Sequence, residues 1–259
     1  MACVTAPRRW QHLGSFVSAG LTVGFLAVAV VLLFDYAGTP AGQRLLAADV
    51  VKGYLPGAQR FLDTGSPYLA EQVAGPWTLD YHSFIHPPVA LFLFTPFLVL
   101  PLALWWILPI GLTLAAIVRL RPSAWAWPLM AACLLWPRST GSLLAGNTDI
   151  WAMTAVATGA AWGWPVVLLA IKPTFAPLGL VAIRARSTWI AAAVLAVISL
   201  PMIPLWLDWL AVITNAHLSW TYSLLNLPLV CIGAIAYLGR RRHATPRPDA
   251  SRDPLDGAP

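Results

Sequence analysis

Apolar runs long enough to form membrane-spanning helices alternate with shorter polar segments along the whole chain. The first run covers residues 15–34 and follows a pair of arginines. Because it extends over about 20 residues and no clean small-residue cleavage site precedes Asp35, we expect a retained helix rather than a removed signal peptide. Near the other end, residues 188–205 and 222–238 predict an out-and-back pair of helices, and residues 206–221 predict the outer loop between them.

The middle of the chain divides less clearly into helices. Residues 87–120 form an apolar run that is too long for one straight helix. Since Pro96, Pro101 and Pro109 can bend or divide this run, one tilted helix and two short ones both fit the pattern. Further apolar runs cover residues 124–136, 148–163 and 164–183. Together the runs predict an all-α polytopic membrane protein with about eight transmembrane helices.

Residues 35–86 form the one long polar interval, and they hold five of the ten acidic residues. Topology places this interval outside, and its apolar residues recur at helical spacing on either side of Pro56, which predicts two short helices lying along the membrane surface. We therefore expect a single transmembrane domain over residues 1–243, in which residues 35–86 are an ordered extracytoplasmic loop. Residues 244–259, rich in Pro, Asp and Arg, predict a disordered cytoplasmic tail.

The composition agrees with this class of protein. The chain of 259 residues is 59% hydrophobic, and 10% of its residues are charged, whereas an ordinary soluble domain has about 25%. The sequence pI of about 9.7 does not indicate nucleic acid as a partner, because the arginines stand at the ends of apolar runs and form no basic stripe. They indicate topology instead, since the arginines at 8–9, 184–186 and 240–242 predict cytoplasmic segments. The widely spaced cysteines predict neither a disulfide framework nor a metal site.

Four short stretches occur in an order that is typical of one family of membrane enzymes. They are "ADVVKGYLPGAQRFLDTGSPYL", "FIHPPVALFLFTPFLVLP", "LLAGNTDIWAM" and "LLAIKPTFAPL". In this order the chain resembles, over residues 15–205, the GT-C glycosyltransferases of family 87 type, which include bacterial mannosyltransferases that use polyprenyl-phosphate mannose. Two positions depart from the family pattern: His86 stands in place of Tyr before Pro-Pro, and Asn147 stands in place of Gln.

The resemblance implies an inverting, metal-independent transfer of a sugar, with mannose as the expected one. The donor would be a polyprenyl-phosphate sugar and the acceptor a glycolipid or polysaccharide. No cofactor is implied, and the site would lie on the extracytoplasmic face of the cytoplasmic (inner) membrane, among membrane lipids. Family members commonly continue further after the Lys-x-x-Pro segment, so the chain resembles a shortened relative, and a further membrane protein is a candidate partner.

Asp49 is the expected catalytic base of residues 35–86. The resemblance places the family's loop carboxylate about where Asp49 stands, 18 residues before Pro67, and sugar transfer needs a base for the acceptor hydroxyl. Asp35, directly after the first apolar run, is the rival, because related GT-C enzymes often carry their acid close to that helix end. The alternative for Asp49 is a solvated loop carboxylate without a catalytic role.

Lys172 is one of two lysines in the chain, and it stands inside an apolar run, where an unpaired ammonium is costly. Because Pro173 and Pro177 would break a helix there, we expect a short hairpin whose tip presents Lys172 to the donor phosphate. Two other interpretations stay open: the side chain reaches an interface, or it pairs with Asp149 for structural reasons.

Two histidines stand at the start of an apolar run. Pro87 and Pro88 suit the first turn of the helix that follows, and His86 is a candidate for contact with phosphate or sugar. His82 either assists or is solvated. A metal pair of His82 and His86 is disfavoured, because Pro87 opposes a regular helix and no third ligand is evident.

Other side chains are further candidates for substrate binding. These are Tyr68 as a sugar platform, Arg60, Asn147 and, in the last outer loop, His217. Simpler explanations stay open for two of them: Tyr68 would anchor the chain at the membrane interface, and Asn147, together with Asp149, would cap the start of a helix.

Two other classes of function also stay open. A transporter or flippase for a lipid-linked intermediate would need Lys172 and a polar cavity too, but it should show repeated halves, and no internal repeat is evident. A shortened, inactive relative that serves as a binding or assembly partner fits the missing C-terminal helices. Lipid binding without turnover would identify it.

Overall fold

The described part of the protein is all-α. The computed structural model describes residues 8–80, 82–216 and 221–241, and none of these residues lies in a named strand. The expected fold class is therefore confirmed at this level. The tail expected over residues 244–259 lies outside the described residues.

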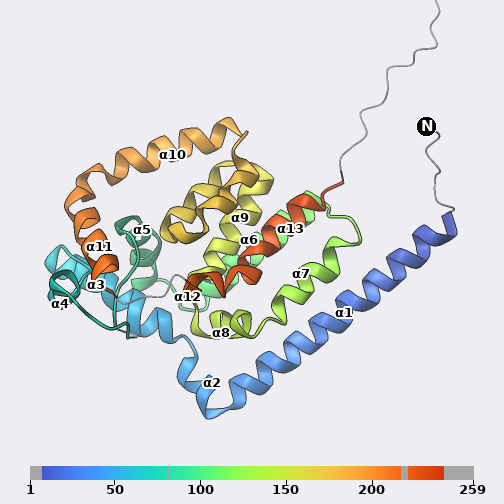
Figure 1. Ribbon diagram of the computed structural model, residues 1–259, viewed down its shortest axis with the longest axis horizontal. Coiled ribbons are helices and arrows are strands. Elements are labelled where there is room, and N and C mark those ends of the chain that lie inside the picture. The colour runs from blue at the N-terminus through green and yellow to red at the C-terminus, as the bar shows by residue number, and fades with distance from the viewer. Residues whose placement is uncertain (1–7, 81, 217–220, 242–259) are drawn as a thin grey trace, which may run out of the picture.

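One helix, α9 (Asp149–Trp162), lies at the centre of the bundle (Figure 1). Every residue from 149 to 159 is buried, as is typical of a helix that is apolar all round. It packs against α6 (Leu104–Leu120) and α13 (Leu227–Leu238), which a short α12 (Thr221–Leu224) precedes. Gly233 lets α13 approach closely, because a Cβ atom at this position would lie 2.4 Å from the backbone nitrogen of Ala157 in α9.

The expected hairpin around Lys172 is present. Two 3-10 helices, η4 (Trp164–Ile171) and η5 (Pro173–Ala182), pack against each other and against α9, and Lys172 lies between them at the tip. Prolines in both segments remove backbone donors and so oppose a long α-helix. The two ends of the hairpin meet where the Ser187 hydroxyl donates to the Trp162 carbonyl (3.3 Å). This stretch therefore runs out and back, as the sequence predicts.

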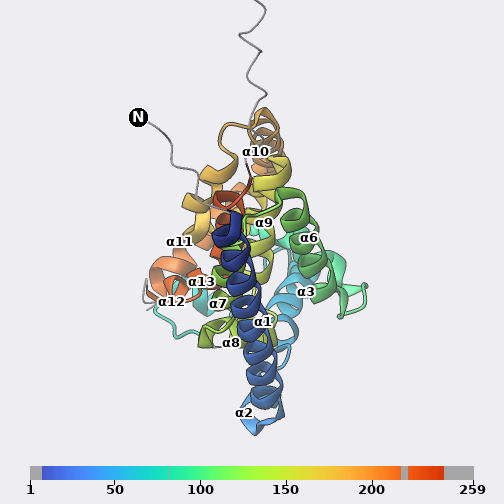
Figure 2. The ribbon, with the colours of Figure 1, turned by 90° about the vertical axis from the view of Figure 1, so that its right-hand side faces the viewer.

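The first helix, α1 (Arg8–Gly38), lies along one side of the bundle and leaves most of its surface uncovered (Figures 1 and 2). It packs against α7 (Ala126–Leu134) and α8 (Pro137–Ala145). The Ser18 hydroxyl donates to the Ala124 carbonyl just before α7. The apolar side chains on the remaining faces of α1 are not covered by the described chain.

Two described helices are long and apolar enough to cross a membrane, by length and composition. They are Gly14–Gly38 within α1, and Arg186–Asn215, which comprises α10 (Arg186–Ser199), η6 (Leu200–Met202) and α11 (Ile203–Asn215). The chain bends between α10 and α11, where prolines interrupt the backbone hydrogen bonds (Figure 1). Part of the expected outer loop is therefore helical. The shorter apolar helices have 10–17 residues, fewer than the roughly 20 that a membrane-spanning helix needs. The expected number of crossings therefore stays a prediction.

The polar interval is helical over much of its length. Its helices are α2 (Pro40–Leu45), η1 (Asp49–Tyr54), α3 (Leu55–Thr64) and α4 (Ala70–Ala74). The two short helices expected on either side of Pro56 form one continuous segment, because the wide π-type turns of η1 lead directly into α3. Pro56 stands in the first turn of α3, where a missing N–H is tolerated.

The apolar run over residues 87–120 is divided before α6. Its first part consists of η2 (Pro88–Ala90), α5 (Leu91–Phe94) and η3 (Thr95–Leu98). Pro88 occupies the first turn of η2, as expected. These short helices pack with α3 and η4 rather than forming a long helix of their own.

The ends of several helices that carry arginines lie together. The Arg241 N–H donates to the Arg121 carbonyl (3.4 Å), and the Arg119 side chain donates to the Ala161 carbonyl (3.2 Å). This side of the bundle is named the arginine end; it carries Arg119, Arg121, Arg184, Arg186, Arg240 and Arg241. α9 starts at the opposite end, about 21 Å away along a helix of 14 residues.

We predict that Gly233→Ala destabilises the protein and that Gly111→Ala does not. The methyl group at 233 would overlap the α9 backbone, and overpacking of this kind costs about 1–3 kcal/mol. Nothing lies within 4 Å of the corresponding position at Gly111 on α6. The measurement is the denaturant midpoint of each variant in detergent. Equal midpoints would contradict the close contact between α9 and α13.

Candidate active site

The turn between α8 and α9 places Asn147 at the end of the bundle opposite the arginine end. Gly146 ends α8 with φ +70°, in the left-handed region that favours glycine. Space also requires glycine here, because a Cβ atom would lie 2.5 Å from the Val50 side chain. The Gly146 carbonyl accepts from the Trp105 indole (2.7 Å), so the turn is fixed between α6 and the polar interval.

Asp49 is the first residue of η1, and the π-type turns of η1 bring the side chains of Asp49 and Tyr54 to the start of α9. π-helical turns are rare in proteins, and those that do occur are often found at functional sites. Ala47, just before η1, has φ +58° and donates its N–H to the last turn of α8. The Asn147 amide donates to Asp49 Oδ2 (2.7 Å), and the Tyr54 hydroxyl accepts from the Thr148 N–H (3.3 Å).

Lys172 reaches the same place from the tip of the hairpin. A residue before proline favours extended backbone, and Lys172, directly before Pro173, has φ −143° and ψ 77°. Its ammonium donates to Asn147 Oδ1 (3.0 Å) and forms an ion pair with Asp149. Of the interpretations that stayed open for Lys172, the pairing with Asp149 is the one that the structure contains.

Asn147 joins the charged groups into one network. Its side-chain N–H donates to Asp49, and its side-chain oxygen accepts from the Lys172 ammonium and from the Asp149 backbone N–H (3.1 Å). The last of these contacts is made by the residue before the N-cap of α9, Thr148, whose own side chain forms no cap. Asp149 also accepts from the Ser142 hydroxyl (3.0 Å). The carboxylates of Asp49 and Asp149 and the ammonium of Lys172 therefore lie close together around Asn147.

The two carboxylates differ in their exposure to water. The Asp149 side chain is fully buried and the Lys172 side chain is 12% exposed, so this pair is well shielded. Asp49 is half-buried. Burial raises the pKa of Asp49 above its usual value, although the hydrogen bond from Asn147 and the charge of Lys172 act in the opposite direction. A partly accessible carboxyl with a raised pKa is suited to accept a proton.

His86 lies beside this network as a buried, neutral ring. It meets the Tyr54 ring edge-on at a centroid distance of 4.9 Å, and its Nδ1 lies 3.2 Å from the Ile171 carbonyl at the hairpin tip. Since a carbonyl only accepts, Nδ1 carries the proton. Burial and then the charge of Lys172 lower the pKa of His86 to about 3. The ring therefore offers a phosphate no positive charge at neutral pH, and it joins the polar interval to the hairpin.

Tyr68 and Arg60 hold the polar interval together. Tyr68 is buried, and its hydroxyl donates to the His86 carbonyl (2.8 Å). Its ring lies edge-to-face with Phe84, so it is not open to a sugar, which corrects the expectation of a sugar platform. Arg60 donates to the Pro67 carbonyl and thereby stabilises the turn after α3.

Three further candidates are not part of the network. The His82 N–H donates to the Asp80 side chain (2.9 Å), and His82 is exposed in an irregular segment apart from the buried His86. Asp35 is exposed on α1, and it makes no side-chain hydrogen bond or ion pair with another described residue. His217 lies outside the described residues. Within the described ranges, no group of three or more His, Cys, Asp or Glu is arranged to hold a metal ion.

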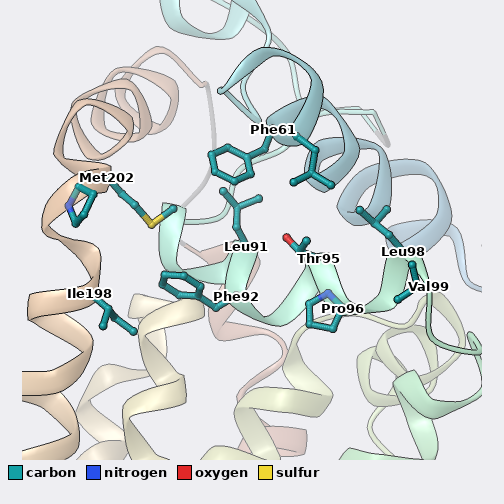
Figure 3. Close-up of a pocket in the computed structure, with 11 residues that line it drawn as sticks. Phe61, Leu91, Phe92, Thr95, Pro96, Leu98, Val99, Ile198 and Met202 are labelled. Atoms are coloured by element: carbon teal, nitrogen blue, oxygen red, sulfur yellow. The ribbon is translucent and has the colours of Figure 1, made fainter.

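The described residues form at least two apolar grooves, and the larger of these two has a volume of about 750 Å³. It lies between α3, the short helices after residue 90 and the bend that leads into α11. Figure 3 shows one side chain from each of these three walls, namely Phe61, Leu91 and Met202. Thr95 is the one polar residue in its lining. Such a groove suits a hydrocarbon chain better than a sugar.

The smaller groove has a volume of about 500 Å³ and lies next to the hairpin tip. Leu169, Ala170 and Pro173, which flank Lys172 in the chain, contribute to its lining. α10 and α11 form its other wall. An apolar surface and the buried ion pair therefore share the tip of the hairpin.

Sequence reasoning missed Tyr54 and Ser142 as members of the network. Tyr54 also stacks on Phe94, with a centroid distance of 4.8 Å and planes 6° apart. Tyr54 follows Asp49 by five residues, the hydrogen-bonding period of a π-helix, but no pattern announces that helix type. Ser142 lies on α8 rather than α9, and the turn at Gly146 is what brings it to the buried carboxylate.

Comparisons of the chain with protein-family models, with curated proteins and with solved structures gave no match. The possible chemistry of the site is therefore inferred from its own side chains. The site combines the partly accessible carboxyl of Asp49 with the ammonium of Lys172, and the Asn147 side chain contacts both. This combination suits reactions that move a proton and stabilise a developing negative charge.

We predict that Asp149→Asn destabilises the protein strongly and that Asp35→Asn does not. Removing one partner of a buried ion pair leaves the other charge uncompensated, at a cost of about 3–5 kcal/mol. A change at the exposed Asp35 should stay within about 0.5 kcal/mol. The measurement is the free energy of unfolding in detergent. Adding Lys172→Met to Asp149→Asn should recover part of the loss, and equal stability of the two single variants would contradict the role of the ion pair.

Proposed function

We propose that the protein is a membrane glycosyltransferase of the GT-C type. It would move a sugar, with mannose as the expected one, from a polyprenyl-phosphate donor to a lipid or polysaccharide acceptor. One observation carries the proposal: Asp49, a half-buried carboxyl with a raised pKa, is linked through a single amide to the ammonium of Lys172. A proton acceptor beside a cation meets the two needs of sugar transfer from a lipid phosphate.

In the proposed reaction, Asp49 takes the proton of the acceptor hydroxyl. The hydroxyl oxygen forms a bond to the anomeric carbon of the donor sugar, on the face opposite the phosphate. The bond between that carbon and the phosphate oxygen breaks, and its electron pair leaves with the lipid phosphate. The configuration at the anomeric carbon is therefore inverted, and no metal or other cofactor takes part.

Lys172 would stabilise the departing phosphate. An ammonium group has three N–H donors, and contacts with Asn147 and Asp149 use two of them. The third is then available to a phosphate oxygen. Because Asp149 fixes the ammonium at the hairpin tip, the charge would be in place before the reaction starts, which is the arrangement that lowers a barrier most.

The proposal includes a multi-pass position in the cytoplasmic membrane, with the site on the extracytoplasmic side. The arginine end would face the cytoplasm by the positive-inside rule, and Asp49 lies at the other end of α9. Exposed tryptophans near the arginine end, among them Trp125, Trp162 and Trp189, suit an aromatic belt. Of the roughly eight crossings expected, the hairpin and residues 88–98 would enter the membrane only in part.

The two apolar grooves support a lipid-linked substrate. Residues of α10 line both grooves, and the smaller groove lies next to Lys172. A hydrocarbon chain in the smaller groove would bring its phosphate close to the ammonium. Besides its substrates, the proposed partners are membrane lipids and a further membrane protein, and nucleic acid has no part in the scheme.

We predict that membranes containing the protein transfer label from polyprenyl-phosphate mannose to lipid acceptors. Asp49→Asn should lower the rate by about 100-fold or more, because a positioned general base contributes about 10²–10⁴-fold. Asp35→Asn is the matched control, since it removes an exposed carboxylate outside the network and should leave the rate unchanged. Protein levels in the membrane are compared at the same time.

Other outcomes of this assay separate the alternatives. Loss of transfer in Asp35→Asn with full transfer in Asp49→Asn would make Asp35 the base. Donor binding without transfer by the unaltered protein would favour an inactive relative that acts as a binding or assembly partner. Passage of the donor lipid across the membrane without sugar transfer would favour a transporter.

The proposed orientation predicts the labelling of two introduced cysteines, in a background without the native ones. Asp63→Cys, on the exposed surface of α3, should react with a membrane-impermeant maleimide in intact cells. Arg241→Cys, at the arginine end, should react only after the membrane has been opened. The reverse pattern would invert the orientation and remove the site from the extracytoplasmic face.

A further inference from the structure

Asn147 contacts both the proposed base and the cation. Its amide group has two N–H donors and an oxygen with two acceptor positions. The oxygen accepts from the Lys172 ammonium (3.0 Å) and from the Asp149 N–H (3.1 Å), and one N–H donates to Asp49 Oδ2 (2.7 Å). The acceptor capacity of the oxygen is therefore used within the protein, so a substrate donor would have to displace one of these contacts.

The contacts allow the amide a single orientation. If its two ends were exchanged, the NH₂ group would face the Lys172 ammonium and the Asp149 N–H, and the oxygen would face the Asp49 carboxylate. Donors would then meet donors and acceptors would meet each other. The backbone is fixed as well, because Gly146 before it has φ +70°. The cation thus orients the amide, and the amide orients the carboxylate.

We propose that Asn147 is a positioning residue, which holds the Asp49 carboxylate in place and in its charged form. The inference rests on the proposed function, because it gives Asn147 a task in the same reaction.

The other groups around Asp49 bear on its charge as well. Burial has the largest effect and raises the pKa of Asp49, and the hydrogen bond from Asn147 is the strongest influence that lowers it. The titratable groups that face Asp49 are Tyr54 of η1, Asp149 of α9 and Lys172 of the hairpin; Lys172 and Tyr54 lower its pKa and Asp149 raises it. Loss of the Asn147 donor would therefore let the pKa of Asp49 rise further.

Asn147→Asp is the informative variant. It keeps an oxygen that accepts from Lys172 and from the Asp149 N–H, but it replaces the donor to Asp49 by a negative charge. Asp49 must be ionised to accept a proton, and a like charge beside it favours its protonated form. We expect the acid limb of the pH–rate profile to move upward by about one pH unit or more, so that kcat is about 10-fold lower or more on that limb, below the pKa of Asp49, with an unchanged KM for the donor.

Asn215→Asp is the matched control. It makes the same change at another half-buried asparagine, whose side chain donates to the Val73 carbonyl (2.7 Å) at the contact between α11 and α4. This variant should lose stability without any movement of the pH–rate profile. Should Asn147→Asp fail to fold, Asn147→Gln is measured in the same way. It keeps the amide but displaces it by one methylene group, so kcat should fall with KM unchanged.

A second readout does not depend on activity. Infrared difference spectra of the purified protein report the C=O stretching band of the protonated Asp49 carboxyl, which Asp49→Asn assigns. The midpoint of this band should move to higher pH in Asn147→Asp. If the midpoint moves while the unaltered protein transfers no sugar, the positioning of Asp49 stands and the proposed function fails. An unmoved midpoint, or a raised KM with an unmoved pH–rate profile, overturns the inference.

Discussion

The ion pair between Lys172 and Asp149 is the contact on which the arrangement of the site depends. Either charge alone among apolar helices would be costly, and each removes that cost for the other. The pair ties the hairpin, whose 3-10 helices have poor internal hydrogen-bond geometry, to the start of the central helix α9. Asn147 lies between the pair and Asp49, so the position of a carboxylate in the polar interval is set by a cation far along the chain.

The class of fold and the hairpin could be predicted from the sequence, and the division of residues 87–120 could not. Apolar runs and arginine bias follow directly from the cost of burying polar groups, and Pro173 removes the donor that a continuous helix would need. For residues 87–120, a tilted helix and two shorter ones bury similar apolar surface. Long-range contacts, from Arg119 to Ala161 and between Arg121 and Arg241, show at which end of the bundle α6 stops.

The members of the site were easier to predict than their connections. Asp49 and Lys172 stand out because charges are scarce in this chain, but the link between them depends on the turn at Gly146 and on the π-type turns of η1. Neither feature has a reliable sequence pattern, since both arise from packing against distant residues. The surroundings of Tyr68 are equally hard to predict, because a tyrosine in a polar interval can face water or protein, and here its hydroxyl donates to the His86 carbonyl.

The chain order of the two paired residues has a consequence for how the protein is made. Asp149 is synthesised before Lys172, so α9 leaves the ribosome with a carboxylate whose cation does not yet exist. A buried charge without its partner costs about 3–5 kcal/mol, and α9 gains its final surroundings only when the hairpin packs onto it. The final packing of α9 therefore depends on a segment that is synthesised after it.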